Sequence, residues 1–179
     1  MPYADVIAGH SFEALAADPS RAEDPLETLI AQVNRLATLL LRQYYPDKAY
    51  AYFGEFLRHV RVISLQDLEP VLEERLTKGE MRALRQLDLL VQGQLREADK
   101  PTDLFLAVEV SAVVDANDVA RAQHRATLLR KAGFRAIPVA AGDEATEGAQ
   151  ATARQQAVLL MQDGLTYNWE EALADALAA

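Results

Sequence analysis

The chain has 179 residues, half of them hydrophobic and a quarter charged, which is ordinary for a globular protein large enough to bury a core. It has no cysteine, which excludes a disulfide framework, a thiolate nucleophile and cysteine-based zinc or iron–sulfur sites. The formal net charge of −9 argues against a protein that coats nucleic acid regardless of sequence, but it leaves room for a small basic patch.

The histidines and the N-terminal sequence limit the type of metal site and the cellular location that the chain is expected to have. His10, His59 and His124 are too scattered to suggest a histidine-based metal cluster, so any metal would have oxygen ligands. The N-terminus lacks a basic region followed by an apolar stretch, and no segment approaches the roughly 18 apolar residues of a membrane span. We therefore expect a cytoplasmic protein that does not enter a membrane.

The N-terminal third is predicted to contain a loose leader, residues 1–23, and a helical extension, residues 24–62. Asp24 and Pro25 have the features of a helix start. The apolar residues that follow have a spacing close to a heptad repeat, which fits a helix packed on its own domain and a dimerising helix pair equally well. These residues are Leu26, Ile30, Val33, Leu36 or Ala37, and Leu40.

Two further helices are expected before the first strand. Pro46 is predicted to stop the first helix, and a second helix is expected from Asp47 to about His59. A third is expected to begin at Ser64 and to end at Gly79.

Residues 63–179 change to a pattern of strands alternating with helices. This order predicts an α/β domain with a mixed sheet and helical cover. Pro138 suggests that its strand lies at an edge or begins there. The expected elements are strands at Leu87–Val91, Leu104–Val110 and Ala136–Ala140, a helix capped within Asp115–Asn117 and running to Ala132 before a stop at Gly133, a helix at about 146–155, an apolar run at Val158–Met161 and a terminal helix from Asn168.

Two acids lie inside otherwise apolar predicted strands, where an isolated carboxylate is costly to bury. Alternation along the second strand places Glu109 and Ser111 on one face, and Asp88 would converge on them if the two strands form a hairpin. Two such carboxylates would suit Mg²⁺, which prefers oxygen ligands. Alternatively, each acid faces solvent or pairs with an arginine such as Arg82 or Arg125.

Asp88 in its apolar strand, a glycine-containing loop and then Val108-Glu109-Val110-Ser111 resemble the D…ExK signature of the PD-(D/E)XK nuclease superfamily. Further stretches, among them Tyr52–Gly54, Arg58–Ile63 and Arg121–Leu129, resemble a bacterial branch of that superfamily with an N-terminal helical, coiled-coil-like extension. The resemblance implies a restriction-endonuclease-like core of order α-β-β-β-α-β from about residue 64 to 162. It places the first of the three strands within Met81–Arg85 or merges it with the Asp88 strand.

The resemblance also implies site roles. Asp88, Glu109 and the Val110 carbonyl would hold Mg²⁺ or Mn²⁺, and Ser111 stands where the superfamily has its lysine. A serine hydroxyl cannot supply the positive charge of that lysine. Some members carry the basic group on the following helix, where Gln123 and Arg130 are expected to reach the site and Arg121 to project outward.

Two functions follow from these features. The first is an Mg²⁺-dependent nuclease-like protein that acts on phosphodiester bonds of DNA or RNA, with Asp88, Glu109, Ser111 and Gln123 as catalytic residues. The second is a non-catalytic binding or scaffold module of the same fold, which forms a homodimer or binds a partner through its N-terminal helices. The acidic net charge and Ser111 favour the second function.

Overall fold

The computed structural model describes the backbone of residues 19–178 and the side chains of residues 25–178. It divides the chain into two units, residues 1–36 and residues 37–179. The predicted leader lies outside the described residues up to residue 18. Within the described part, no helix is long and apolar enough to cross a membrane.

The first described element, α2, is one helix, Pro19–Phe53, that starts earlier than predicted and continues through Pro46. The predicted stop at Pro46 is wrong. A proline inside a helix removes a backbone hydrogen bond and costs about 3 kcal/mol. Burial of Tyr45, Ala49 and Phe53 against the sheet offsets this cost. Tertiary packing therefore overrides the local signal.

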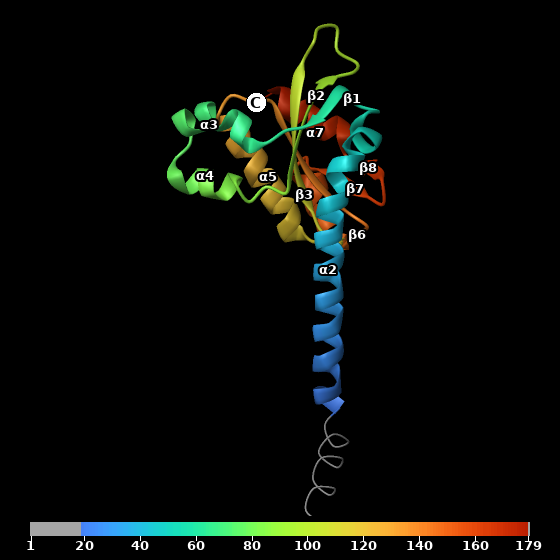
Figure 1. Cartoon of the computed structure of the whole chain (residues 1–179). Helices are drawn as coiled ribbons and strands as arrows, with labels where there is room; N and C mark the ends of the chain where they lie inside the picture. The colour runs from blue at the N-terminus through green and yellow to red at the C-terminus, as the bar shows by residue number, and fades with distance from the viewer. Residues whose placement is uncertain (1–18, 179) are drawn as a thin grey trace, which may run out of the picture. The chain divides into compact units, whose positions relative to one another are not determined.

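Six strands form one mixed sheet in the order β1-β2-β3-β5-β7-β8, and β4 pairs with β6 in a small second sheet. Strands β1, β2 and β3 form an antiparallel meander (Figure 1), β3, β5 and β7 run parallel, and β8 returns antiparallel to β7. The bounds are β1 Leu57–Val62, β2 Leu89–Leu95, β3 Asp103–Val110, β4 Val113–Val114, β5 Ala136–Gly142, β6 Glu144–Ala145, β7 Leu159–Gln162 and β8 Leu165–Tyr167.

Helices make the connections that parallel strands require, because a tight turn cannot join parallel neighbours. Helix α5 joins β3 to β5 and α6 joins β5 to β7. The side chain of Asp115 caps α5 by accepting hydrogen bonds from the backbone N–H groups of Asn117 and Asp118. The bounds are η1 Leu65–Leu68, α3 Glu69–Arg75, α4 Lys78–Leu84, α5 Ala116–Lys131, α6 Glu147–Gln155 and α7 Trp169–Ala178.

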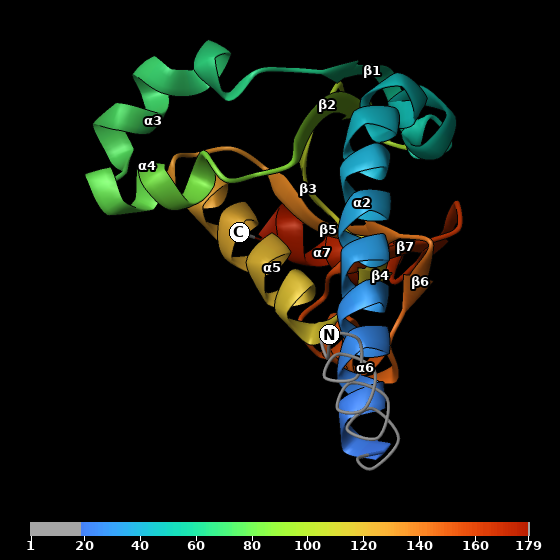
Figure 2. The ribbon, with the colours of Figure 1, turned by 60° about the horizontal axis from the view of Figure 1, so that its bottom comes forward.

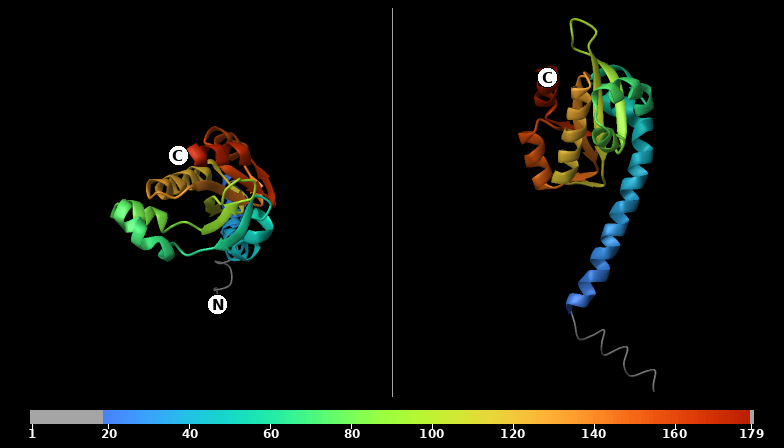
Figure 3. Two further views of the ribbon diagram at one scale, coloured as in Figure 1. Left: turned by 90° about the horizontal axis from the view of Figure 1, so that it is seen from above. Right: turned by 90° about the vertical axis from the view of Figure 1, so that its left-hand side faces the viewer.

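Helices cover both faces of the sheet in residues 37–179. On one face, α7 and the part of α2 beyond residue 36 pack on alternate strand residues such as Leu106 and Val108. On the other face, α3, α4 and α5 pack on Leu90, Phe105 and Ala107, and they lie together on one side in Figure 2. Helix α5 runs alongside the strands in the right-hand view of Figure 3. Helix α6 covers β7 on this second face.

The predicted α/β class with a mixed sheet is confirmed, but the first strand and the helices before the Asp88 strand were misplaced. Residues 57–62 form β1, which pairs with β2, although the sequence predicted helix up to about His59. Residues 81–84, where a first strand was expected, belong to α4. The expected third helix is divided into η1, α3 and α4, and Gly79 lies inside α4 rather than ending a helix.

Pro138 lies in a central strand, between β3 and β7, and not at a sheet edge. It is tolerated there because the pairing of β5 with β7 begins only at the next residue, Val139, opposite Leu159. The N–H that proline lacks is therefore not required by that ladder.

Candidate functional site

The β2–β3 hairpin brings the two candidate acids together. Its register pairs Leu89 with Val108 and Leu90 with Ala107. Continued by one residue, this register sets Asp88, immediately before β2, across from Glu109 near the end of β3. Directly opposed residues of an antiparallel pair have side chains on the same face. The hairpin on which their convergence depended is therefore present.

The Asp88 carboxylate is held by the backbone of β3 and by α2. Its Oδ2 accepts a hydrogen bond of 2.9 Å from the backbone N–H of Val110. Its Oδ1 lies 2.9 Å from Nε of Arg42, which also donates to the Val110 carbonyl at 3.3 Å. Arg42 thus contacts two of the three groups that the sequence predicted as metal ligands.

The Glu109 carboxylate is almost fully buried, with a side chain only 3% exposed. Its Oε1 pairs with Nη1 of Arg125, and its Oε2 lies 3.5 Å from Nε of Arg121. Burial raises the pKa of Glu109, the positive charge of Arg125 opposes that shift, and the negative charge of Asp88 adds to it. The influence of Asp88 on this pKa agrees with the proximity that the hairpin register requires.

Ser111 does not replace the charge of a lysine, and its hydroxyl is engaged in the loop after β3. The Ser111 hydroxyl donates to the carbonyl of Val113 at 3.1 Å, and its backbone N–H donates to Ala141 at 3.0 Å. Burial raises the pKa of the nearby Asp118 carboxyl, whereas the backbone of Asp115, the charge of Arg121 and the Ser111 hydroxyl act to lower it.

Helix α5 presents to Glu109 a different side from the one predicted. Arg121, which was expected to project outward, reaches Glu109 and also pairs with Asp118. Arg130, which was expected to reach the site, instead donates to the Ala136 carbonyl and pairs with Asp175 at 2.7 Å. In an α-helix, residues four apart share a face, which is why Arg121 and Arg125 act together.

Gln123 makes neither the contacts of Arg121 and Arg125 with Glu109 nor those of Arg130 with Ala136 and Asp175. Its position on α5 is on the flank that carries Arg130 and not on the flank that carries Arg121 and Arg125. Its buried Oε1 has no hydrogen-bond partner among the described residues. The predicted catalytic role of Gln123 would require it to act from the far side of the helix.

A surface groove of about 570 Å³ runs beside Glu109, between the end of α4 and α5. We call it the arginine groove. It has basic side chains at three positions and no acidic one in its lining, although the whole chain carries a net charge of −9. Its lining residues are Ala83, Gln86, Asn117, Ala120, Arg121, His124 and Arg125.

The predicted ligand set has the oxygen chemistry that Mg²⁺ and Mn²⁺ prefer, with two carboxylates and the Val110 carbonyl. However, each oxygen of Asp88 and Glu109 already has a partner within the protein: Arg42, the Val110 N–H, Arg125 and Arg121. Among the described residues, no group of three or more acids and histidines is arranged to hold a metal ion. A cation held by both carboxylates would have to displace Arg42 from Asp88 and an arginine of α5 from Glu109.

The link to α2 is the feature that sequence reasoning missed. The Thr38 hydroxyl oxygen accepts a hydrogen bond of 2.9 Å from the backbone N–H of Ala112, one turn before Arg42 on the same helix face. The four-residue spacing of Thr38 and Arg42, on the side opposite the apolar residues, was the available signal. It does not reveal which strand the two residues contact.

No family model, curated protein or solved structure matches this chain.

Proposed function

We propose that the chain is a nuclease-like protein that binds the phosphodiester backbone of nucleic acid and acts on it with Mg²⁺ or Mn²⁺. The observation that carries the proposal is that Asp88 and Glu109 oppose each other at the β2–β3 hairpin, with Glu109 paired with both arginines that line the arginine groove. Acids hold a cation and arginines bind phosphate, so the two features together suit a phosphodiester substrate.

The order of elements supports the restriction-endonuclease-like core. An antiparallel meander of β1, β2 and β3 is followed by the crossover helix α5 and the parallel strand β5. Helices α3 and α4 are inserted between β1 and β2. In this arrangement the acids lie on adjacent strands, as the D…ExK motif requires.

Each residue has a distinct part in the proposed activity. Asp88, Glu109 and the Val110 carbonyl would hold the cation, which when bound would activate water and stabilise charge on a phosphoryl group. Arg121, Arg125 and His124 would bind phosphate oxygens in the arginine groove, and a planar guanidinium can do so through two parallel hydrogen bonds. The arginines of α5 would supply the positive charge that Ser111 lacks.

A cleavage and metal-binding assay tests this proposal. Purified protein is incubated with single- and double-stranded DNA and RNA in Mn²⁺, beside Asp88→Asn and Glu109→Gln. We expect metal-dependent cleavage and an increase in melting temperature with Mn²⁺, both abolished by either substitution. Asp103→Asn is the matched control, because Asp103 is exposed on the same strand as Glu109. Absence of both effects in the wild-type protein would refute the metal-dependent activity.

The second candidate function, a non-catalytic module that forms a homodimer through its N-terminal helix, is favoured by separate observations. The carboxylate oxygens of Asp88 and Glu109 are already satisfied by the protein. In addition, α2 carries exposed apolar side chains, each 51–67% accessible, which we call the apolar stripe. The stripe consists of Leu26, Leu29, Ile30, Val33, Leu36 and Leu40.

A second copy of α2 is the partner that suits this stripe. Leu26, Ile30, Val33, Ala37 and Leu40 alternate in steps of four and three, the spacing by which two like helices interlock. Between residues 25 and 41 the only charged residues are Glu27 and Arg35, so two acidic chains can approach here without like-charge repulsion. Sedimentation equilibrium tests this candidate, and a wild-type protein that stays monomeric at high concentration would exclude it.

A further inference from the structure

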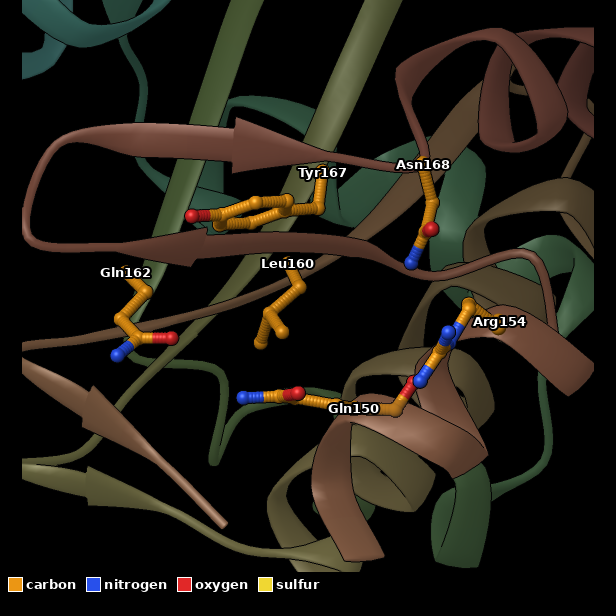
Figure 4. Close-up of a pocket in the computed structure, with 6 residues that line it drawn as sticks. All are labelled: Gln150, Arg154, Leu160, Gln162, Tyr167 and Asn168. Atoms are coloured by element: carbon orange, nitrogen blue, oxygen red, sulfur yellow. The ribbon is translucent and has the colours of Figure 1, made fainter. Parts of the chain in front are cut away.

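A second pocket, away from Asp88 and Glu109, lies between α6 and the β7–β8 hairpin and has a volume of about 410 Å³. Figure 4 shows the side chains around it. We call it the amide pocket. Its volume is within the usual range of small-molecule sites, roughly 300–1,000 Å³. Its lining residues are Gln150, Arg154, Leu160, Gln162, Tyr167 and Asn168.

The backbone presents these residues to one space. Gln150 and Arg154 are four apart on α6 and therefore share a helix face. Leu160 and Gln162 alternate along β7 and share a strand face, and Tyr167 of β8 is paired directly with Leu160. One helix and one hairpin thus build the walls.

The lining has an unusual chemistry for this acidic chain. It contains three side-chain amides, one guanidinium, one phenol ring and one leucine, and no carboxylate. Amides both donate and accept hydrogen bonds, so they can pair with the mixed donor and acceptor edge of a planar heterocycle. A tyrosine ring can stack on such a heterocycle, and stacking accepts any base because every base has a π-face.

The guanidinium of Arg154 remains available for an anion. Its Nε donates to the Gln150 carbonyl at 3.3 Å, and none of the described carboxylates lies within ion-pairing distance of it. The amide of Asn168 is held at the edge by a hydrogen bond of 3.3 Å from its Nδ2 to the Val158 carbonyl. That bond uses one donor and leaves the amide oxygen as an acceptor.

We propose that the amide pocket binds a nucleotide, with the base between Tyr167 and the amides of Gln150, Gln162 and Asn168 and the phosphate on Arg154. The nucleotide is either free or part of a single strand. This proposal does not depend on catalysis at Asp88 and Glu109, because binding here requires no metal.

The sheet places this pocket on the face that also carries Glu109. The register runs from Glu109 to Ala140, then to Leu160 and to Tyr167, each paired with the next across the strands. With neighbouring strands about 4.8 Å apart, Tyr167 lies about 14 Å from Glu109 along the sheet. Helices α5 and α6 cover the sheet between the two places and leave Ala140 fully buried, so a nucleotide in the pocket does not reach the acids along the sheet.

Fluorescence anisotropy of a short labelled deoxythymidine strand, measured in EDTA, tests the proposal. We expect Tyr167→Ala to weaken binding roughly tenfold through loss of stacking, and Arg154→Gln to weaken it by a similar factor. The matched controls are Tyr50→Ala and Arg135→Gln, which alter exposed residues outside the pocket and should leave binding unchanged.

Competition distinguishes the two sources of nucleotide. Displacement of the strand by AMP, with AMP binding also weakened by Tyr167→Ala, would support a site for a free nucleotide. A strand that binds and is not displaced by AMP, but is weakened by both pocket variants, would support a single-strand site. No binding of either probe, or binding that neither variant weakens, would overturn the proposal. Displacement by inorganic phosphate alone, with no effect of Tyr167→Ala, would also overturn it.

Because the measurement contains no metal, its outcome is separate from that of the cleavage assay. Loss of cleavage in Asp88→Asn with unchanged binding of the strand would leave the amide pocket intact as a site.

Discussion

The site around Asp88 and Glu109 and the apolar stripe of α2 depart from the usual distribution of polarity in opposite directions. At the first, charged groups are buried inside the domain, and each carboxylate oxygen has an arginine or backbone partner. At the second, large apolar side chains are exposed to water on a helix. Buried charges must be satisfied inside the fold, whereas an exposed apolar surface gains free energy only when something covers it. The carboxylates are thus satisfied within one chain, whereas the apolar stripe is left uncovered by the described residues.

The largest expected effect is a loss of stability at the buried site around Glu109. Arg125→Met removes the closest partner of Glu109 and leaves the buried carboxylate with only the 3.5 Å contact to Arg121, which should destabilise the fold by about 3 kcal/mol at neutral pH. Because the raised pKa of Glu109 should rise further, the variant should regain stability as the pH falls toward the acid range, where the carboxyl takes a proton. Urea unfolding at neutral and acidic pH measures both effects.

A matched control is Arg130→Met, whose partner Asp175 is 44% exposed and can be hydrated instead. It should cost about 1 kcal/mol, with little dependence on pH. Equal losses in the two variants would show that Glu109 does not depend on Arg125.

The second prediction concerns dimerisation through the exposed apolar stripe of α2. If α2 mediates dimerisation, Val33→Glu places a charge in the centre of the apolar stripe of both chains. Losing burial of two valines, each worth about 1.5 kcal/mol or more, should raise the dimer dissociation constant roughly a hundredfold. Sedimentation equilibrium measures this constant.

The control for the helix is Thr28→Glu, because Thr28 lies on the side of α2 away from the stripe. It adds the same charge and should leave the dissociation constant unchanged. If Thr28→Glu dissociates the protein as strongly as Val33→Glu does, the stripe is not the contact surface.

The third prediction, with the smallest expected effect, concerns Arg42, which connects α2 with the site around Asp88. Arg42→Gln removes from α2 the guanidinium that contacts Asp88 and the Val110 carbonyl. If Arg42 competes with a divalent cation, the affinity for Mn²⁺ should increase about tenfold, the value of one charge-assisted hydrogen bond. Electron paramagnetic resonance of free Mn²⁺ measures that affinity.

Arg35→Gln is the control for this third prediction, since Arg35 lies on the same helix with no ion pair among the described residues. It should leave Mn²⁺ affinity as in the wild type. A decrease in affinity in Arg42→Gln would mean that Arg42 supports the cation site instead of competing with it.

Local patterns were sufficient to predict several elements of the fold. Alternation in Leu104–Val110 set the faces of β3, the Asp115 cap and Gly133 bounded α5, and the order of elements indicated a mixed sheet. Local chemistry suffices here because a cap, a turn or an alternating strand involves residues close in sequence.

Tertiary structure decided where distant segments compete or meet. Burial of Tyr45 and Phe53 against the sheet kept α2 helical through Pro46, against the local signal of that residue. Pairing with β2 made residues 57–62 a strand, although the sequence predicted a helix as far as about His59. Such outcomes depend on packing free energies summed over partners far apart in the chain, which exceed local propensities.

Some residues of the candidate site were likewise predictable from the sequence, and others only from the tertiary structure. The sequence indicated Asp88 and Glu109, because a carboxylate within an apolar strand is conspicuous, and it named Arg125 as one alternative partner. It could not select Arg42 or Arg121, because a charged residue on a helix is usually solvated. Only the fold brings Arg42 from 46 residues before Asp88 to its carboxylate and turns Arg121 toward Glu109. The sequence thus determined which acids must be satisfied, and the tertiary structure decided which cations satisfy them.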